Sequence, residues 1–254
     1  MLRLARPTAV NHINSEGFMS EHNPTLPVAR RSFLARLGGG LSVAGVSLLG
    51  GVPDAAAQSA TGGAARFQPA RHAQDDWMDT LPGKHRFVFD ATTAPTFGAA
   101  LAYANNFFMA SDTGYGLKDP DAAVIIVARH FATPFAYKDA IWAKYGTPLT
   151  GVTSLSDPKT KQPPTINLYN AAGYDDLANM GTTVDAVLKR GVHFAVCQMA
   201  TKFFAGMLAG PGGNADAVYN EVVANLIPNS HMVSAGIVAV NRAQERGYTL
   251  ATPV

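Results

Sequence analysis

The sequence between residues 122 and 128 reads AAVIIVA, an unbroken apolar run that directly follows Asp121. A run of this length is expected for a strand that is buried on both faces, as in a parallel sheet covered by helices. Similar short runs read RFVFD at residues 86–90 and HFAV at residues 193–196. Helical patterns separate these runs, and the alternation predicts an α/β fold with a parallel sheet covered on both faces.

Further elements follow from helical periodicity and from residues that cap helices. Asp175 or Asp176 is a suitable N-cap for a helix that ends at Gly191, and Ser234 for one that ends at Gly247. We expect helices around residues 97–108, 137–144, 175–191, 201–208, 218–226 and 234–247, and short strands at residues 232–233 and 248–250.

Two segments lack a sustained pattern. Residues 58–83 are rich in Gly, Ala, Pro and polar residues, which predicts a flexible arm ahead of a domain at residues 84–254. Residues 146–173 contain four prolines among Thr, Ser and Lys residues and predict a long loop. Loops of this length are uncommon in compact domains and often have a function.

Residues 1–57 have the features of an export signal. Residues 29–35 read ARRSFLA, which fits the twin-arginine consensus, and an apolar stretch over residues 37–52 follows. Small residues at positions 55–57 suit cleavage after Ala57. Met19 begins a conventional n-region of a signal peptide. Residues 1–18 therefore fit an over-extended start, in which the start codon has been assigned upstream of the true one.

The apolar stretch is shorter than the roughly 20 residues that span a bilayer, and its glycines weaken it as a membrane helix. The alternatives are an uncleaved anchor and an internal core helix. We expect export by the twin-arginine (Tat) pathway to the periplasm, with no stable membrane insertion after cleavage.

Charge and cysteine content exclude some classes of function and of stabilising bond. Residues 1–57 hold five of the 20 Lys and Arg residues and three of the 18 Asp and Glu residues, so 15 of each sign remain in residues 58–254. A neutral chain lacks the clustered basic face that nucleic-acid binding needs. The single cysteine, Cys197, excludes an intramolecular disulfide, and a domain of this size does not need one.

Cys197 is the strongest candidate for a reactive residue. It follows the apolar run at residues 193–196 and precedes the helix that Thr201 is expected to open. In open parallel sheets, ligands bind beyond the carboxyl ends of the strands. A thiolate at a helix N-terminus is also favoured by free N–H groups and by the helix dipole. The alternative is a buried cysteine that only packs, which is common for this residue type.

His130 is the second candidate, because it follows the run at residues 122–128 and is expected at the same sheet edge as Cys197. An imidazole there can act as a base or a ligand, or serve as a hydrogen-bonded structural residue. His193 and His231 begin their strands and belong at the opposite edge. With no His-x-x-x-His or Cys-x-x-Cys spacing, we expect no metal site, and no motif names a cofactor.

Three segments resemble the DsrE/DsrF-like family. Residues 191–200, GVHFAVCQMA, are similar to the family's strand-then-cysteine segment, and residues 124–130 to a strand that ends in histidine. Residues 232–248 resemble its closing helix and strand. The match covers residues 84–254, with the loop at residues 146–173 as an insertion. Phe131 stands where the family has Gly, and residues 203–206, FFAG, where an Arg-Gly pair is frequent.

The resemblance implies a three-layer α/β/α domain with a mostly parallel sheet of about five strands, assembled as trimers or hexamers. It also implies that Cys197 carries sulfane sulfur as a persulfide, supported by His130, Gln198 and Thr201, with a sulfur-donor protein or a thiol acceptor protein as partner. The family's sulfur-relay members are cytoplasmic, whereas this chain has an export signal.

A second interpretation is a non-enzymatic module that binds a small ligand or assembles with other proteins. Its pocket would lie under the loop at residues 146–173. Exposure of the thiol separates the two interpretations, because a carrier needs a reachable thiol and a binding module does not.

Overall fold

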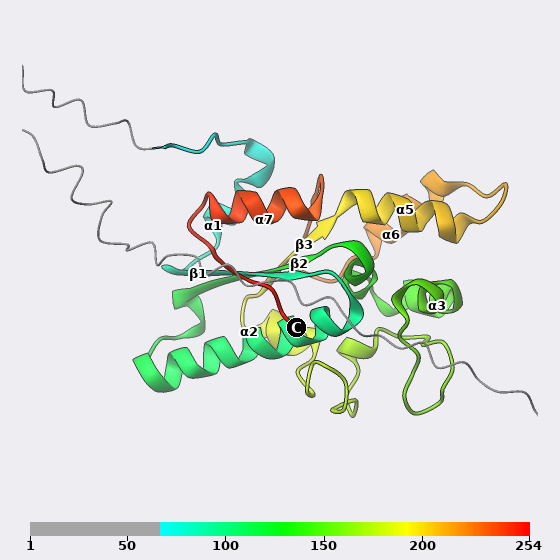
Figure 1. Ribbon diagram of the computed structural model, residues 1–254, viewed down its shortest axis with the longest axis horizontal. Helices are drawn as coiled ribbons and strands as arrows, with labels where there is room; N and C mark the ends of the chain where they lie inside the picture. Colours follow the sequence, from blue (N-terminus) through cyan, green and yellow to red (C-terminus); the bar gives the residue numbers. More distant parts are fainter. Residues whose placement is uncertain (1–66) are drawn as a thin grey trace, which may run out of the picture. The chain divides into compact units, whose positions relative to one another are not determined.

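The structure, a computed structural model, describes residues 67–254. One sheet contains five parallel strands: β1 (His85–Ala91), β2 (Ala122–Ala128), β3 (His193–Cys197), β4 (Ser230–Val233) and β5 (Thr249–Ala251). Their spatial order is β4-β3-β2-β1-β5, which puts β2 in the centre (Figure 1). All residues of β2 are buried, as the apolar run predicts. The predicted α/β fold with a sheet of about five parallel strands is confirmed.

Helices lie on both sides of the sheet and form the outer two of three layers (Figure 1). The helices are α1 (Trp77–Thr80), α2 (Ala94–Tyr115), α3 (Asp139–Thr153), α4 (Val184–Lys189), α5 (Gln198–Ala209), α6 (Ala215–Ala224) and α7 (Gly236–Gln244). Short 3₁₀ turns are η2 (Ala73–Asp75), η3 (Asp119–Asp121), η4 (His130–Ala136) and η5 (Leu168–Asn170). α1 and α7 cover one face of the sheet, whereas α2 and α4 cover the other.

Each face of the sheet has its own apolar core. The larger core includes Phe97, Ile126 and Trp142, and the smaller core, under α1 and α7, includes Ile125 and Val240. Ile125 and Ile126 are neighbours in β2 that point to opposite faces, since side chains alternate along a strand. Because β2 is buried on both faces, helices must cover the sheet on both sides.

Helix α3 is longer than the sequence predicts, so the loop expected at residues 146–173 begins only after Thr153. Pro148 lies inside the helix, where a proline removes a backbone hydrogen bond. Ile141, Tyr145 and Leu149 nevertheless form a buried stripe at helical spacing. Burial of this stripe outweighs the missing hydrogen bond and carries the helix past the proline.

Helix α4 is shorter than predicted. Its N-cap is Thr183, whose hydroxyl accepts an N–H of the first turn, and neither Asp175 nor Asp176 caps it. Met180 and Gly181 have φ angles of 49° and 78°, in the left-handed region. Two successive residues of this kind cannot continue a right-handed helix, so the helix starts after them.

Helix α5 begins at Gln198, directly after β3, and not at Thr201 as predicted. Cys197 is its N-cap, with the sulfur in the place of the usual hydroxyl acceptor. Helix α7 likewise differs from the prediction, because its N-cap is Ala235, without a side-chain hydrogen bond, and Ser234 lies outside the cap.

Part of the predicted arm at residues 58–83 is folded onto the domain. Met78 and Leu81 are buried in the smaller core. Arg246, which follows the end of α7, holds the segment by an ion pair with Asp79, at 3.0 Å between Nε and Oδ2. The Tyr248 hydroxyl donates to the Met78 carbonyl oxygen at 2.7 Å. Anchoring by so few side chains leaves little trace in composition, so the packed domain starts before residue 84.

The export signal expected in residues 1–57, its possible over-extended start at residues 1–18, and the first part of the 58–83 segment lie outside the described residues. Within residues 67–254, no helix combines the length and the hydrophobicity that a membrane span requires.

Candidate functional site

Cys197 occupies the junction of β3 and α5. It is the last residue of the strand and the N-cap of the helix. Its sulfur accepts the backbone N–H of Ala200, at 3.4 Å between N and Sγ. The unpaired N–H groups of a first helical turn and the helix dipole both favour negative charge at this position. The local geometry therefore suits a thiolate.

An ion pair lies beside the cysteine. Arg129, which follows β2, donates to both carboxylate oxygens of Asp90 in β1, at 2.6 Å and 2.8 Å. The pKa of Arg129 is raised, chiefly by the hydrogen bond to Asp90 and further by the negative charge of that carboxylate. Arg129 and Cys197 line the same cavity, so a cation lies on the wall that contains the sulfur.

His130 adopts a backbone conformation that side chains rarely take. Its φ angle is 53°, in the left-handed region, which is unfavourable for a residue with a Cβ atom. The 3₁₀ turn η4 holds it there, because the Ala132 N–H donates to the carbonyl oxygens of Arg129 and Thr92 at 3.0 Å and 3.1 Å. The imidazole lies against the Phe131 ring, with centroids 4.0 Å apart.

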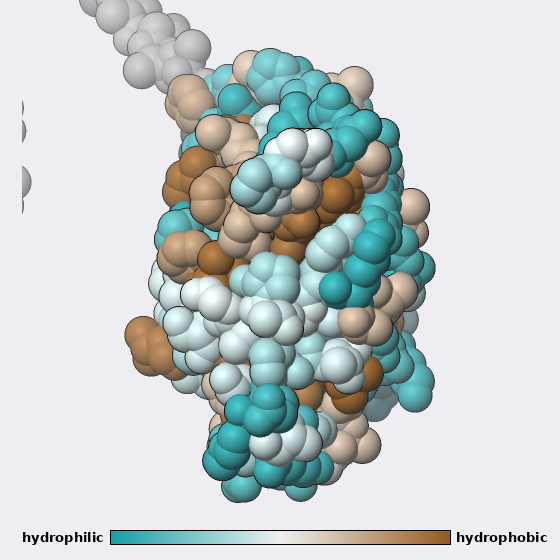
Figure 2. Space-filling model, turned by 90° about the vertical axis from the view of Figure 1, so that its right-hand side faces the viewer, coloured by the Kyte–Doolittle hydropathy of each residue, from teal (hydrophilic) through white to brown (hydrophobic). Residues whose placement is uncertain are grey.

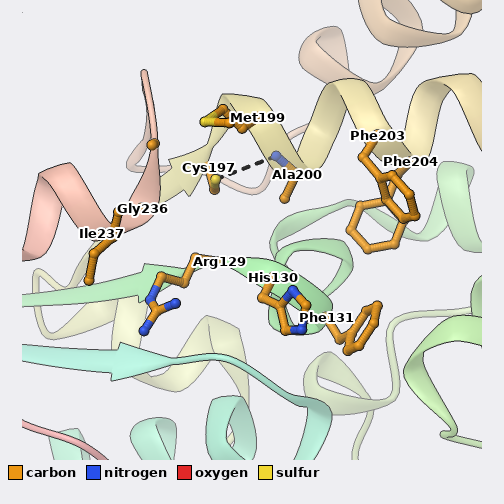
Figure 3. A pocket seen from close by; sticks show the side chains of 11 residues that line it. Arg129, His130, Phe131, Cys197, Met199, Ala200, Phe203, Phe204, Gly236 and Ile237 are labelled. Atoms are coloured by element: carbon orange, nitrogen blue, oxygen red, sulfur yellow. Dashed lines mark hydrogen bonds between the residues drawn. The ribbon is translucent and has the colours of Figure 1, made fainter.

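These residues share one cavity of about 370 Å³. Its walls come from the end of β2 with η4, from the β3–α5 junction, and from the start of α7 (Figure 3). The structure thus brings Cys197 and His130 together at the carboxyl edge of the sheet, as expected. Besides these two and Arg129, the lining residues are Phe131, Met199, Ala200, Phe203, Phe204, Ala235, Gly236 and Ile237.

Several wall residues are open to solvent. Met199 is 69% exposed, Phe203 60% and Ile237 57%. Figure 2 views the right-hand side of the molecule in Figure 1, and hydrophobic residues gather in the upper half of that face. Clustered exposed apolar residues around a cavity are typical of ligand or partner sites.

The two other residues expected in the site do not line the cavity. The Thr201 hydroxyl is buried; it donates to the carbonyl oxygen of Cys197 at 2.9 Å and accepts from the Tyr137 hydroxyl at 3.3 Å. The Gln198 amide donates to the Tyr219 hydroxyl of α6 at 2.9 Å. Thr201 therefore fixes the start of α5, and Gln198 joins α5 to α6.

Arg129, Asp90 and Gly236 complete the site, although the sequence alone does not single them out. A Cβ atom at Gly236 would overlap the side chain of Arg129, so glycine lets α7 pack directly against the arginine. The sequence does contain a signal for the ion pair. Asp90 and Arg129 stand at the ends of two apolar runs, and a charge next to a buried strand needs a partner.

The opposite edge of the sheet holds a closed aromatic cluster. His193 Nδ1 and His231 Nε2 are 2.9 Å apart, and Trp77 stacks on His231 with centroids 3.8 Å apart. Burial lowers the pKa of His193, and burial together with the charge of His193 lowers the pKa of His231 to about 4. Both rings are therefore neutral at pH 7, and one nitrogen donates to the other.

A second cavity, of about 390 Å³, lies against the loop that follows α3. Asn167 and Asn170 of the loop line it, together with Lys138, Asp139 and Asp185. The Asn167 N–H donates to Asp139 Oδ1 at 2.8 Å, which ties the loop to the start of α3. In the part of the chain that the structure describes, no three His, Cys, Asp or Glu side chains are arranged to hold a metal ion.

No protein-family model matches this sequence, and no curated protein is similar enough to it to count as a relative.

Proposed function

We propose that this chain is an exported DsrE-like protein of sulfur metabolism or redox handling that carries sulfane sulfur as a persulfide on Cys197. The supporting observation is the position of the thiol, at a helix N-terminus, beside Arg129 and on the wall of an open cavity. Cys197 is only 6% exposed, but the cavity gives small donors a route to its sulfur.

The carrier cycle consists of two thiol-exchange steps. In the first, the Cys197 thiolate attacks the outer sulfur of a donor persulfide, the donor S–S bond breaks, and the donor thiolate leaves with the electron pair. In the second, an acceptor thiolate attacks the outer sulfur of the Cys197 persulfide and restores the cysteine. Sulfur moves between thiols, and no net oxidation occurs.

Three groups around Cys197 assist these steps. The Ala200 N–H and the Arg129 guanidinium stabilise the thiolate that attacks and the one that is released. The His130 imidazole lines the same cavity and is available to take the proton of the incoming thiol. Asp90 holds Arg129 in place.

The proposal includes a cellular setting. The arginines at positions 30 and 31 direct the folded protein through the twin-arginine pathway to the periplasm, and Ala57 precedes the cleavage site. By resemblance, the protein forms a homo-oligomer, a trimer or hexamer, and exchanges sulfur with a donor or acceptor protein. Changing Arg30 and Arg31 to Lys should leave uncleaved precursor in the cytoplasm. Light scattering on the mature protein should give a mass larger than that of one chain.

The central test is sulfur loading of the purified protein by inorganic polysulfide, followed by intact-mass measurement. We expect the native protein to gain sulfur that a small thiol removes, whereas Cys197→Ser and Cys197→Ala gain none. Thermal unfolding of both variants checks that the domain is intact. A native thiol that resists alkylation until the protein is denatured contradicts the carrier function.

The second cavity supports an alternative function as a binding module. It lies against the loop after α3, where the second interpretation of the sequence expects a pocket, and its mixed lining includes charged and amide side chains. If Cys197 proves inert, binding of a small polar ligand there remains the function to test, with Asn170→Ala as the variant expected to weaken it.

A further inference from the structure

We propose that the cavity beside Cys197 selects persulfides that carry an apolar organic group, R–S–SH with R an alkyl or arylalkyl chain, over inorganic polysulfide and over persulfides with charged groups. This inference rests on the proposed sulfur-carrier function of Cys197 and adds the class of donor. The size of the cavity, its charge and its rim support this donor class.

The size of the cavity indicates an organic donor. At about 370 Å³ it falls within the range of sites for small organic molecules, about 300–1,000 Å³. A donor made of a few sulfur atoms would leave most of this volume unfilled. The space next to the thiol therefore has room for the group R.

The charge of the cavity disfavours anionic donors. Arg129 is the one Lys or Arg residue among the lining residues, and both oxygens of Asp90 already accept hydrogen bonds from it. The helix N-terminus favours negative charge at the Cys197 sulfur itself, but a carboxylate or a polyanion on the rest of the donor would lose hydration without gaining an unpaired cation. An uncharged R group has no such penalty.

The rim of the cavity offers apolar surface to R. Met199 and Phe203 lie four residues apart on α5 and so share one side of the helix, while Ile237 extends from the start of α7 on the opposite wall (Figure 3). All three are more than half exposed, so a bound chain would remove their apolar surface from water. Methionine also adapts to chains of different shape because it is unbranched.

The reaction is the loading step with R specified. The Cys197 thiolate attacks the outer sulfur of R–S–SH, a new S–S bond forms, and the bond between the two donor sulfurs breaks. R–S⁻ leaves with the electron pair, and the proton of the outer sulfur stays on the Cys197 persulfide. No oxidant or reductant is consumed.

The test compares ethyl, butyl and hexyl persulfides, generated in solution, as donors to the purified protein. The rate of loading at Cys197 is measured by intact mass. It is divided by the rate at which the same donor transfers sulfur to N-acetylcysteine, a reference acceptor, and this ratio removes differences in donor reactivity. We expect this ratio to rise by roughly two- to fourfold per methylene, because burial of one methylene contributes up to about a factor of four. Inorganic polysulfide should load more slowly than hexyl persulfide.

Matched variants locate the effect. Met199→Gln and Phe203→Ser should remove most of the dependence on chain length. Met109→Gln and Tyr115→Ser replace exposed apolar residues on α2, which does not line the cavity, and should keep the dependence.

The outcomes separate the donor class from the carrier function. If Cys197 is loaded at rates that do not depend on chain length, or if the α2 variants lose the dependence equally, the donor class is overturned and the carrier function stands. If no donor loads Cys197, both are overturned.

Discussion

The two edges of the sheet differ in what covers the ends of the same strand. In β3, His193 and Cys197 lie four residues apart, so their side chains point to the same face. At the amino edge, Trp77 and His231 close over His193. At the carboxyl edge, Cys197 faces an open cavity beside an ion pair and a helix N-terminus. A helix N-terminus favours an anion, so the thiol lies at the edge that suits it.

The ion pair at the carboxyl edge should give the largest stability effect. Asp90→Asn removes the charge that neutralises Arg129, whose side chain is 26% exposed. Breaking a buried pair costs about 3–5 kcal/mol, and with this partial exposure we expect about 2–4 kcal/mol in the free energy of unfolding, measured by urea denaturation. Sulfur loading should also slow, because Arg129 loses its fixed position.

A matched exposed pair serves as the control. Asp112→Asn removes the partner of Lys118 on the surface, and this change should leave the urea midpoint unchanged. If Asp90→Asn also leaves the urea midpoint unchanged, the stability of the carboxyl edge does not depend on its ion pair.

The aromatic cluster should give the next largest effect, and on stability alone. Trp77→Ala removes the ring of α1 that stacks on His231 of β4. The substitution therefore weakens the contact between α1 and the sheet. Truncation of a fully buried Trp costs about 3–5 kcal/mol, and for this half-buried ring we expect about 2–3 kcal/mol. The sulfur-loading rate should not change. A variant that lost loading while still folded would show that the two edges are coupled.

The histidine pair should make stability depend on pH. His231 has an ordinary pKa of 6.5 and a folded pKa of about 4, so the unfolded chain binds its proton first as the pH falls. The contribution of the neutral pair is thus complete above pH 6.5 and is lost as the pH falls toward 4. The melting temperature of the His193→Gln, His231→Gln double variant should fall less across this window. Equal slopes for both proteins would contradict the neutral pair.

The sequence predicts the sheet better than the junctions around it. The apolar runs at residues 86–90, 122–128 and 193–196 correspond to β1, β2 and β3, because two-sided burial leaves a direct pattern in the residue types. The helix starts are predicted poorly. Cysteine is not one of the usual N-cap residues, so the cap of α5 at Cys197 leaves no familiar signal in the sequence. Helix α3 continues through Pro148 because its buried stripe packs into the larger core, which is a tertiary contact.

The candidate site is predictable in the same uneven way. Strand order brings Cys197 and His130 to one edge, which topology alone implies. The Arg129–Asp90 pair and the close approach of Gly236 require the register of β1 against β2 and the position of α7, and neither is encoded in a local pattern.

The smallest effect is expected at Gln198, which stands next to the cysteine but points toward α6. Gln198→Ala removes one hydrogen bond to the Tyr219 hydroxyl, and both groups are partly solvated, so water can replace each partner. We expect a loss of about 0.5–1 kcal/mol in the free energy of unfolding, measured by urea denaturation. The rate of sulfur loading at Cys197 should equal that of the native protein. A large drop in the loading rate at unchanged stability would show that Gln198 takes part in sulfur loading. Adjacency to the thiol would then matter more than the direction of the side chain.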